Sequence, residues 1–186
     1  MELFRESRLR HGRYLLRKRA DTVTRKRFRG NLKNARSIGI VWDASDISGF
    51  PVLSQFQQKM QDRNIETRIL AYYPEKVLPD RLTAIRYLSC IRRDDLNFFY
   101  IPVSGESESF IKTSFDVLIE INFSNSFPVE YITTLSRAGI KTGLYDEKRN
   151  NNPYDLMIDA GKPVRLDEYL ENVIQYLELI NTNAEN

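Results

Sequence analysis

The stretch Phe115–Asp146, FDVLIEINFSNSFPVEYITTLSRAGIKTGLYD, decides the fold that we expect for this chain. Residues 115–121 form a nearly continuous apolar run, which is typical of a strand buried on both faces. A polar loop follows at 122–126, and residues 128–138 carry apolar side chains at helical spacing. Residues 140–145 indicate another strand. Because a helix connects the two strands, the unit predicts a parallel sheet.

Similar strand and helix patterns lie on both sides of this stretch. Residues 37–43 (SIGIVWD) and 65–73 indicate two strands, with a helix between them that ends near Arg63. Towards the C-terminus, we expect a short strand at 156–159 and a closing helix from 166 to about 181. The sequence therefore predicts an α/β fold: a three-layer sandwich with a mostly parallel sheet of about five strands, Rossmann- or flavodoxin-like, preceded by a basic N-terminal helix.

Three details of this fold can be tested against a structure. The strands that begin near Ser37 and Phe115 are both apolar throughout, so we expect them to be parallel neighbours inside the sheet. Trp42, in the first of them, should then be buried. Residues 98–103 (FFYIPV) are interpreted as a short strand, whereas residues 75–97 give no clear periodicity.

The charge of the chain is divided unevenly. Residues 1–36 hold thirteen Lys and Arg but three Asp and Glu, and residues 37–186 hold fifteen and twenty-two. We therefore predict a basic helical extension over 1–36 and an α/β domain over 37–186. A basic extension on a mildly acidic domain favours an anionic partner.

The basic extension is interpreted as one helix over roughly residues 3–28, ended by Gly30 and Asn31. Its cations would meet nucleic-acid phosphates or anionic lipid. The alternative is a helix that packs on the domain, or on a second copy of the chain, and leaves a solvated basic face. The candidate polyanion-binding residues are Arg10, Arg13, Arg17, Lys18, Arg25, Lys26 and Arg29.

A second candidate site comes from two similar loops. Residues 43–49 and 122–126 each follow a buried strand, carry two serines and lead to Phe-Pro at a helix start. In open α/β sheets, ligands bind at the carboxyl ends of the strands where the strand order reverses. The same residues also cap helices in any α/β protein, which is the alternative. The candidate ligand-binding residues are Asp43, Ser45, Ser124, Asn125 and Ser126.

Other residue types limit the chemistry that we expect. His11 is the only histidine, which argues against a Ser-His-Asp triad and a multi-histidine metal site. Cys90 lies near Arg92 and Arg93, which would activate it, but a buried inert thiol is the simpler interpretation. Glu120, at the end of a buried strand, is either a desolvated general base or a solvated residue. We predict no catalytic residue, no metal and no cofactor.

The chain resembles a family of uncharacterised conserved proteins from Bacteroidetes. The resemblance rests on the basic N-terminal helix, SIGIVWD, DLNFF, FDVLI and LSRAGIKTGL, and it covers nearly the whole chain. It implies the fold and the source but no activity. DVLIE and KTGL also resemble the N-terminal half of heptosyltransferase-type glycosyltransferases over about thirty residues. We find no counterpart here of the second domain, which binds the donor sugar nucleotide in those enzymes.

These observations favour a non-enzymatic binding protein. We expect its basic N-terminal helix to contact a polyanion, such as nucleic acid, or a protein partner, with a homodimer through that helix as a further possibility. The alternative is a small enzyme or ligand-binding protein with an anion site formed by the two loops. No apolar run reaches the length of a transmembrane segment, no secretory signal is evident, and one cysteine fits a reducing compartment, so we expect a cytoplasmic location.

Overall fold

The computed structural model describes residues 4–147 and 153–180, and it confirms the α/β fold class. Within these residues the sheet has six parallel strands in the order β3-β2-β1-β4-β5-β6, one more than the approximate number expected. The strands are β1 (Ser37–Asp43), β2 (Glu66–Tyr73), β3 (Leu88–Arg92), β4 (Val117–Ile121), β5 (Ile140–Leu144) and β6 (Leu156–Ile158). The helices are α1 (Arg5–Ala20), α2 (Phe50–Asp62), α3 (Gly105–Lys112), α4 (Phe127–Leu135) and α5 (Leu166–Leu179), with short 3-10 turns at Ile47–Gly49, Asp80–Leu82 and Arg93–Asp95.

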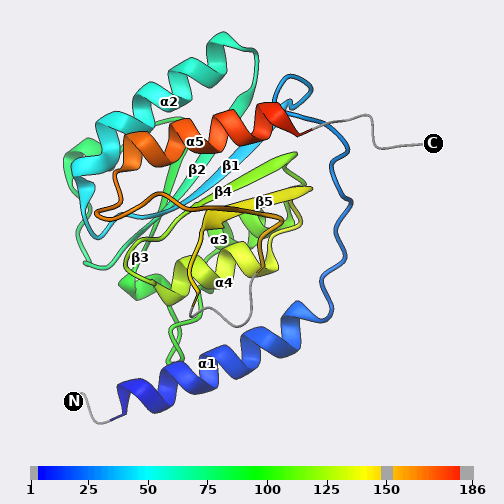
Figure 1. Ribbon diagram of the computed structural model, residues 1–186. Helices are drawn as coiled ribbons and strands as arrows, with labels where there is room; N and C mark the ends of the chain where they lie inside the picture. Colours follow the sequence, from blue (N-terminus) through cyan, green and yellow to red (C-terminus); the bar gives the residue numbers. More distant parts are fainter. Residues whose placement is uncertain (1–3, 148–152, 181–186) are drawn as a thin grey trace.

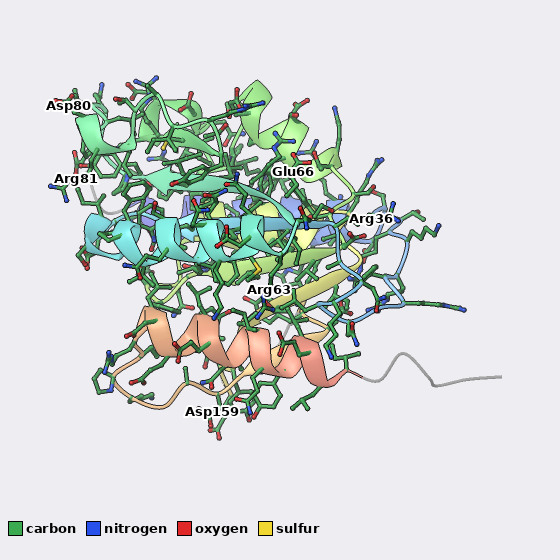
Figure 2. The ribbon with its side chains drawn as sticks, turned by 90° about the horizontal axis from the view of Figure 1, so that it is seen from above. Arg36, Arg63, Glu66, Asp80, Arg81 and Asp159 are labelled. Atoms are coloured by element: carbon green, nitrogen blue, oxygen red, sulfur yellow. The ribbon has the colours of Figure 1, made fainter. Side chains whose placement is uncertain are left out.

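The helices cover both faces of the sheet, which gives the three-layer sandwich. Helices α2 and α5 lie on one face, and α3 and α4 lie on the other (Figure 1). Figure 2 shows α2 and α5 side by side, with Arg63 directed between them, and Arg63 Nη1 lies 2.6 Å from Glu178 Oε1 of α5. Helix α1 packs on the outside of α4 and so forms an additional layer (Figure 1).

The two strands expected to be neighbours are paired at the centre of the sheet. β1 and β4 are parallel, with Ile38 opposite Val117 and Trp42 opposite Ile121, and Trp42 is 2% exposed. Both predictions are confirmed. The strand order reverses between β1 and β4, because β2 and β3 extend the sheet on one side and β5 and β6 on the other. The carboxyl ends of these two central strands are therefore where a ligand is expected in this fold.

The N-terminal helix is shorter than predicted. α1 ends at Ala20, not near residue 28, and residues 21–36 run along the side of the domain to β1 (Figure 1). Two causes are visible. Thr22, Val23 and Thr24 are β-branched and lower the helix propensity. The Thr22 hydroxyl donates a hydrogen bond to the Arg19 carbonyl, and this gives a partner to one of the carbonyl groups in the last turn of the helix.

The region between β2 and α3 was predicted least well. β3, an edge strand at Leu88–Arg92, falls in the segment without clear periodicity. The strand expected at 98–103 is wrong: the backbone turns there, with Tyr100 at φ 60°, and only an isolated bridge joins Leu96 to Pro102. Asn97 Oδ1 stabilises the turn by accepting hydrogen bonds from the N–H groups of Phe99 and Ile101.

The basic N-terminal segment, residues 4–36, contributes to two separate apolar clusters. Leu16 of α1 packs with Phe127 and Tyr131 of α4, outside the main core. Leu32 and Ala35, by contrast, are buried in the main core under α5, where the Leu32 N–H donates to the Leu177 carbonyl. The division at residue 36 stays a prediction. The burial of Leu32 and Ala35 nevertheless means that these two residues contribute to the stability of the main core.

This packing predicts different costs for two leucine truncations. Leu32→Ala should lower the free energy of unfolding by about 2–5 kcal/mol, because it opens a cavity in the main core. Leu9→Ala, at a half-buried position of α1, should cost about 1 kcal/mol or less. Urea unfolding followed by the fluorescence of Trp42, the single tryptophan, measures both. Equal losses would show that the N-terminal helix is as much a part of the core as residue 32.

Candidate functional site

The loops after β1 and β4 meet at the carboxyl end of the sheet, as their sequences suggested. The Ser124 hydroxyl donates a hydrogen bond to Asp43 Oδ2, and the Ser45 hydroxyl donates to Asp43 Oδ1 at 2.6 Å. A cavity of about 360 Å³ opens beside them. Its lining residues are Trp42, Asp43, Ser45, Asp46, Ser48, Gly49, Ile121, Phe123, Ser124, Val164 and Leu166. Three of the five predicted ligand-binding residues thus share one crevice.

The other two predicted residues lie elsewhere. The Ser126 N–H donates to Asn122 Oδ1 at 2.6 Å, and its carbonyl accepts from Asn122 Nδ2 at 3.0 Å, so these groups close the loop before α4. Asn125 has φ 59° and lines a different, larger cavity. The loop after β4 therefore contributes to two different cavities, Ser124 to one and Asn125 to the other.

The crevice at Asp43 is acidic. Hydrogen bonds from the Ser48 N–H and hydroxyl lower the pKa of Asp46, so its carboxylate stays charged. The described residues that line this crevice include no Lys or Arg. Carboxylates, serine hydroxyls and the rings of Trp42 and Phe123 suit a hydroxyl-bearing neutral ligand, or a cationic one, better than the anion expected from the loop pattern.

The predicted basic residues divide into two groups. Arg10, Arg17, Lys18, Lys26 and Arg29 are exposed. Arg13 and Arg25 are engaged by the domain: Arg13 Nε lies 3.6 Å from Glu130 Oε2, and Arg25 forms a bidentate pair with Asp155 at 2.5 and 2.8 Å. The side chain of Arg25 is 17% exposed, so this pair is less screened by solvent than an ion pair on the open surface.

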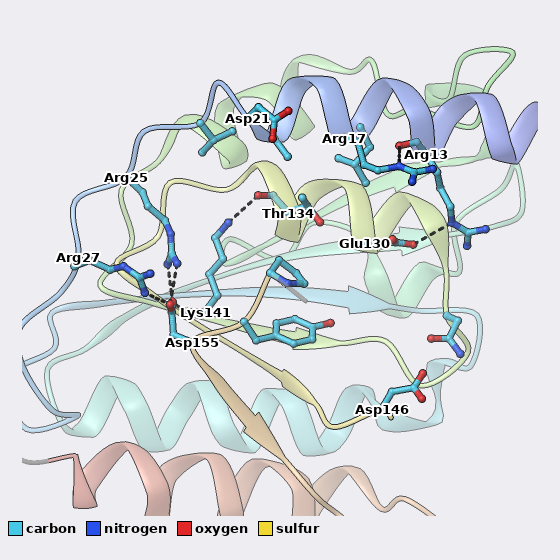
Figure 3. Close-up of a pocket in the computed structure, with 16 residues that line it drawn as sticks. Arg13, Arg17, Asp21, Arg25, Arg27, Glu130, Thr134, Lys141, Asp146 and Asp155 are labelled. Carbon is cyan, nitrogen blue, oxygen red and sulfur yellow. Dashed lines mark hydrogen bonds and ion pairs between the residues drawn. The ribbon is translucent and has the colours of Figure 1, made fainter. Parts of the chain in front are cut away.

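The basic segment and the domain enclose a second cavity, of about 940 Å³ (Figure 3). It lies between α1 with residues 21–27 on one side and α4, β5 and residues 153–155 on the other. Its lining residues are Arg13, Leu16, Arg17, Ala20, Asp21, Val23, Arg25, Arg27, Asn125, Glu130, Thr134, Lys141, Asp146, Pro153, Tyr154 and Asp155.

Lys141 on β5 is a buried charged residue of this cavity that the sequence did not single out. It is 3% exposed, and its amino group donates a hydrogen bond to the Thr134 carbonyl of α4 at 2.8 Å (Figure 3). Burial lowers the pKa of Lys141 to about 7, and the nearby charges of Arg25 and Arg27 lower it as well, whereas Glu120 opposes them. The available signal was a lysine inside the strand expected at 140–145, in a sheet that helices were expected to cover on both faces.

Asp155, also missed, connects the segment to the sheet. Its carboxylate accepts hydrogen bonds from Arg25, from Arg27 and, at 2.9 Å, from the Lys141 N–H. Its own N–H donates to the Lys141 carbonyl at 2.8 Å. Since the sequence places Asp155 after a polar loop, nothing in its surroundings distinguished it from other surface acids.

Two other groups singled out in the sequence have structural partners. Glu120 is 2% exposed, and its Oε1 accepts a hydrogen bond from the Tyr154 hydroxyl at 2.7 Å. Gly143 leaves the space that the ring of Tyr154 occupies. Burial raises the pKa of the Cys90 thiol to about 11, so little thiolate is present at neutral pH. This agrees with the interpretation of Cys90 as an inert thiol.

Two other kinds of feature are absent from the described residues. No three His, Cys, Asp or Glu side chains within 4–147 and 153–180 gather as a metal ion would require. Over the same residues, no helix has both the length and the apolar character needed to cross a membrane.

Comparison with known proteins agrees with the resemblance to an uncharacterised conserved family. The profile of a family of unknown function (DUF6913) matches residues 8–180, which is most of the chain. No curated protein matches the sequence. The expectation of an uncharacterised conserved family is therefore confirmed.

The buried amine predicts a specific dependence of stability on pH. The unfolded chain protonates Lys141 up to its ordinary pKa, whereas the folded chain releases this proton near pH 7. The free energy of unfolding should therefore rise between about pH 7 and 10, by up to roughly 4 kcal/mol, and the penalty should be complete below pH 7. Urea unfolding of wild type and Lys141→Met at several pH values isolates this contribution as a difference. A constant difference would contradict it.

Proposed function

The chain belongs to the family of unknown function DUF6913, and we propose that it is a non-enzymatic binding protein whose basic N-terminal segment contacts the phosphates of a nucleic acid. The observation that supports this most directly is the set of exposed cations that the domain leaves unpaired. Arg10, Lys26 and Arg29 take part in no ion pair with the described residues, and Lys18 contacts only the ring of Tyr14.

The fixed position of the segment favours binding. Because Arg13 and Arg25 tie the segment to Glu130 and Asp155, its backbone is held before any partner arrives. Less conformational entropy is then lost when the exposed cations meet phosphates. A polyanion is preferred over a protein partner because the exposed side chains are cationic at many positions, whereas Tyr14, which is 46% exposed, is the one exposed large hydrophobic residue within α1.

A ligand in the acidic crevice is the second candidate function. The cavity of about 360 Å³ lies where the strand order reverses, beside Asp43 and Ser124, and it would admit a small hydroxyl-bearing molecule. Glycosyl transfer is not proposed, since the likeness to heptosyltransferases covers about thirty residues. The proposal also includes two expectations, a cytoplasmic location and a Bacteroidetes origin. The cytoplasmic location is expected because the chain has a single cysteine, which fits a reducing compartment.

The test is binding of a single-stranded RNA and a duplex DNA over a salt series. Replacing Arg10, Lys18, Lys26 and Arg29 together by Ala should weaken binding at every sequence. It should also reduce the slope of log affinity against log salt by up to about 3 for RNA, because each lost phosphate contact removes about 0.7.

A matched control removes the same number of exposed cations from the domain, at Lys59, Arg81, Arg86 and Arg93. This variant should retain most of the wild-type slope. Equal losses in the two variants would show that binding follows net charge alone. Absence of salt-dependent binding by the wild-type chain at low ionic strength would exclude nucleic acid and leave a protein partner or a second copy of the chain.

A further inference from the structure

The amino group of Lys141 has hydrogen-bonding capacity that the described residues do not use. A protonated lysine offers three N–H donors, and here one of them reaches the Thr134 carbonyl. The residue lines the cavity of about 940 Å³ although it is only 3% exposed. Keeping such a buried amine protonated is costly, so an acceptor that enters the cavity and takes the spare donors would stabilise its charged form.

Three cations lie near the carboxylate of Asp155, namely Arg25, Arg27 and Lys141, and Glu120 is a further carboxylate that acts on the amine. Arg25 donates to Asp155 through Nη1 and Nη2, and its Nη1 also donates to the carbonyls of Ala138 and Gly139. Arg27 donates to Asp155 through Nη1, and its Nε and Nη2 make no hydrogen bond with the described residues. Lys141 and Arg27 therefore keep N–H donors that no described residue accepts.

The remainder of the cavity suits an organic group. Leu16, Ala20 and Val23 give it an apolar wall, and Tyr154 and Pro153 lie at the opposite side. Its volume is within the range of sites for metabolite-sized ligands. A free inorganic ion would leave most of that space empty.

We propose that this cavity binds a small phosphorylated molecule, with its phosphate held by Lys141 and Arg27 and its organic part against Leu16 and Val23. The site is separate from the exposed cations that were assigned to nucleic acid, and it uses residues of the domain as well as of the segment. It does not rest on nucleic-acid binding, because none of the four exposed cations tested above lines the cavity.

Binding should depend on pH through Lys141. The charged and titratable groups around its amine are Arg25 and Arg27 from the segment, Glu120 from β4, Tyr154 and Asp155 before β6, and Glu130 and Asp146 on the cavity wall. The pKa of Lys141 is lowered to about 7 in the free protein, so the amine becomes largely neutral above that pH. Affinity for a phosphate should accordingly fall by about 10-fold between pH 6.5 and 8.5.

Isothermal titration of the full chain with pyrophosphate, at constant ionic strength, tests the site. Lys141→Met should weaken binding by at least about 10-fold, and Arg27→Ala by about 5-fold or more. Lys141→Arg should restore binding and remove its pH dependence, because a guanidinium stays charged throughout this range. The variant of Arg10, Lys18, Lys26 and Arg29 should bind pyrophosphate as wild type does.

Three results would overturn the proposal. The first is absence of pyrophosphate binding by the wild-type chain up to about 10 mM. The second is binding by Lys141→Met or Arg27→Ala within about 2-fold of wild type. The third is a loss of pyrophosphate affinity in the four-residue variant equal to that in Lys141→Met, which would place the anion on the exposed face. Far-UV circular dichroism checks that each variant folds. If Lys141→Met does not fold, Arg27→Ala alone decides the test, because the side chain of Arg27 is mostly exposed.

Discussion

The position of the basic segment depends on one carboxylate. Asp155 accepts hydrogen bonds from Arg25, from Arg27 and from the Lys141 N–H, so it joins the N-terminal segment to β5. Its side chain is 18% exposed, and a charge pair in such a place is screened less than one in open solvent. This contact holds residues 25–27 against the start of β5, and it gives the segment an extended path from the end of α1 to β1.

The surroundings of the Lys141 amine explain why a lysine is stable inside β5. Lys141 is buried between the sheet and α4, where a charged amine is costly. Two features offset the cost. Its amino group hydrogen-bonds the Thr134 carbonyl in the last turn of α4, where helix carbonyls otherwise lack partners. The cavity beside it gives access to solvent and, in our proposal, to a phosphate. Together with Arg27, the amine supplies the positive charge that an apolar residue at this position would not.

Much of the fold could be predicted because it follows from local patterns. The apolar runs of β1 and β4 required cover on both faces, which placed them at the centre of the sheet. Their polar ends therefore met, and Asp43, Ser45 and Ser124 share a crevice. The acidic character of that crevice could not be read in the same way, because the loop pattern predicted an anion site at Asp43 and did not indicate that Asp46 would line the same crevice without a cation among the described residues. Lys141, Arg27 and Asp155 come from positions far apart in the chain, and no local pattern brings such residues together.

The most direct test of this account is limited trypsin digestion of the wild-type chain and of Asp155→Asn, with Asp159→Asn as the matched control at an exposed acid near the same strand (Figure 2). Cleavage after residues 25–27, mapped by mass spectrometry, reports how often the segment leaves the domain. The account predicts that Asp155→Asn raises the rate of this cleavage by about 10-fold and that Asp159→Asn leaves it unchanged. Equal rates in all three proteins would show that Asp155 does not hold the segment, and the cation-lined cavity would lose its basis.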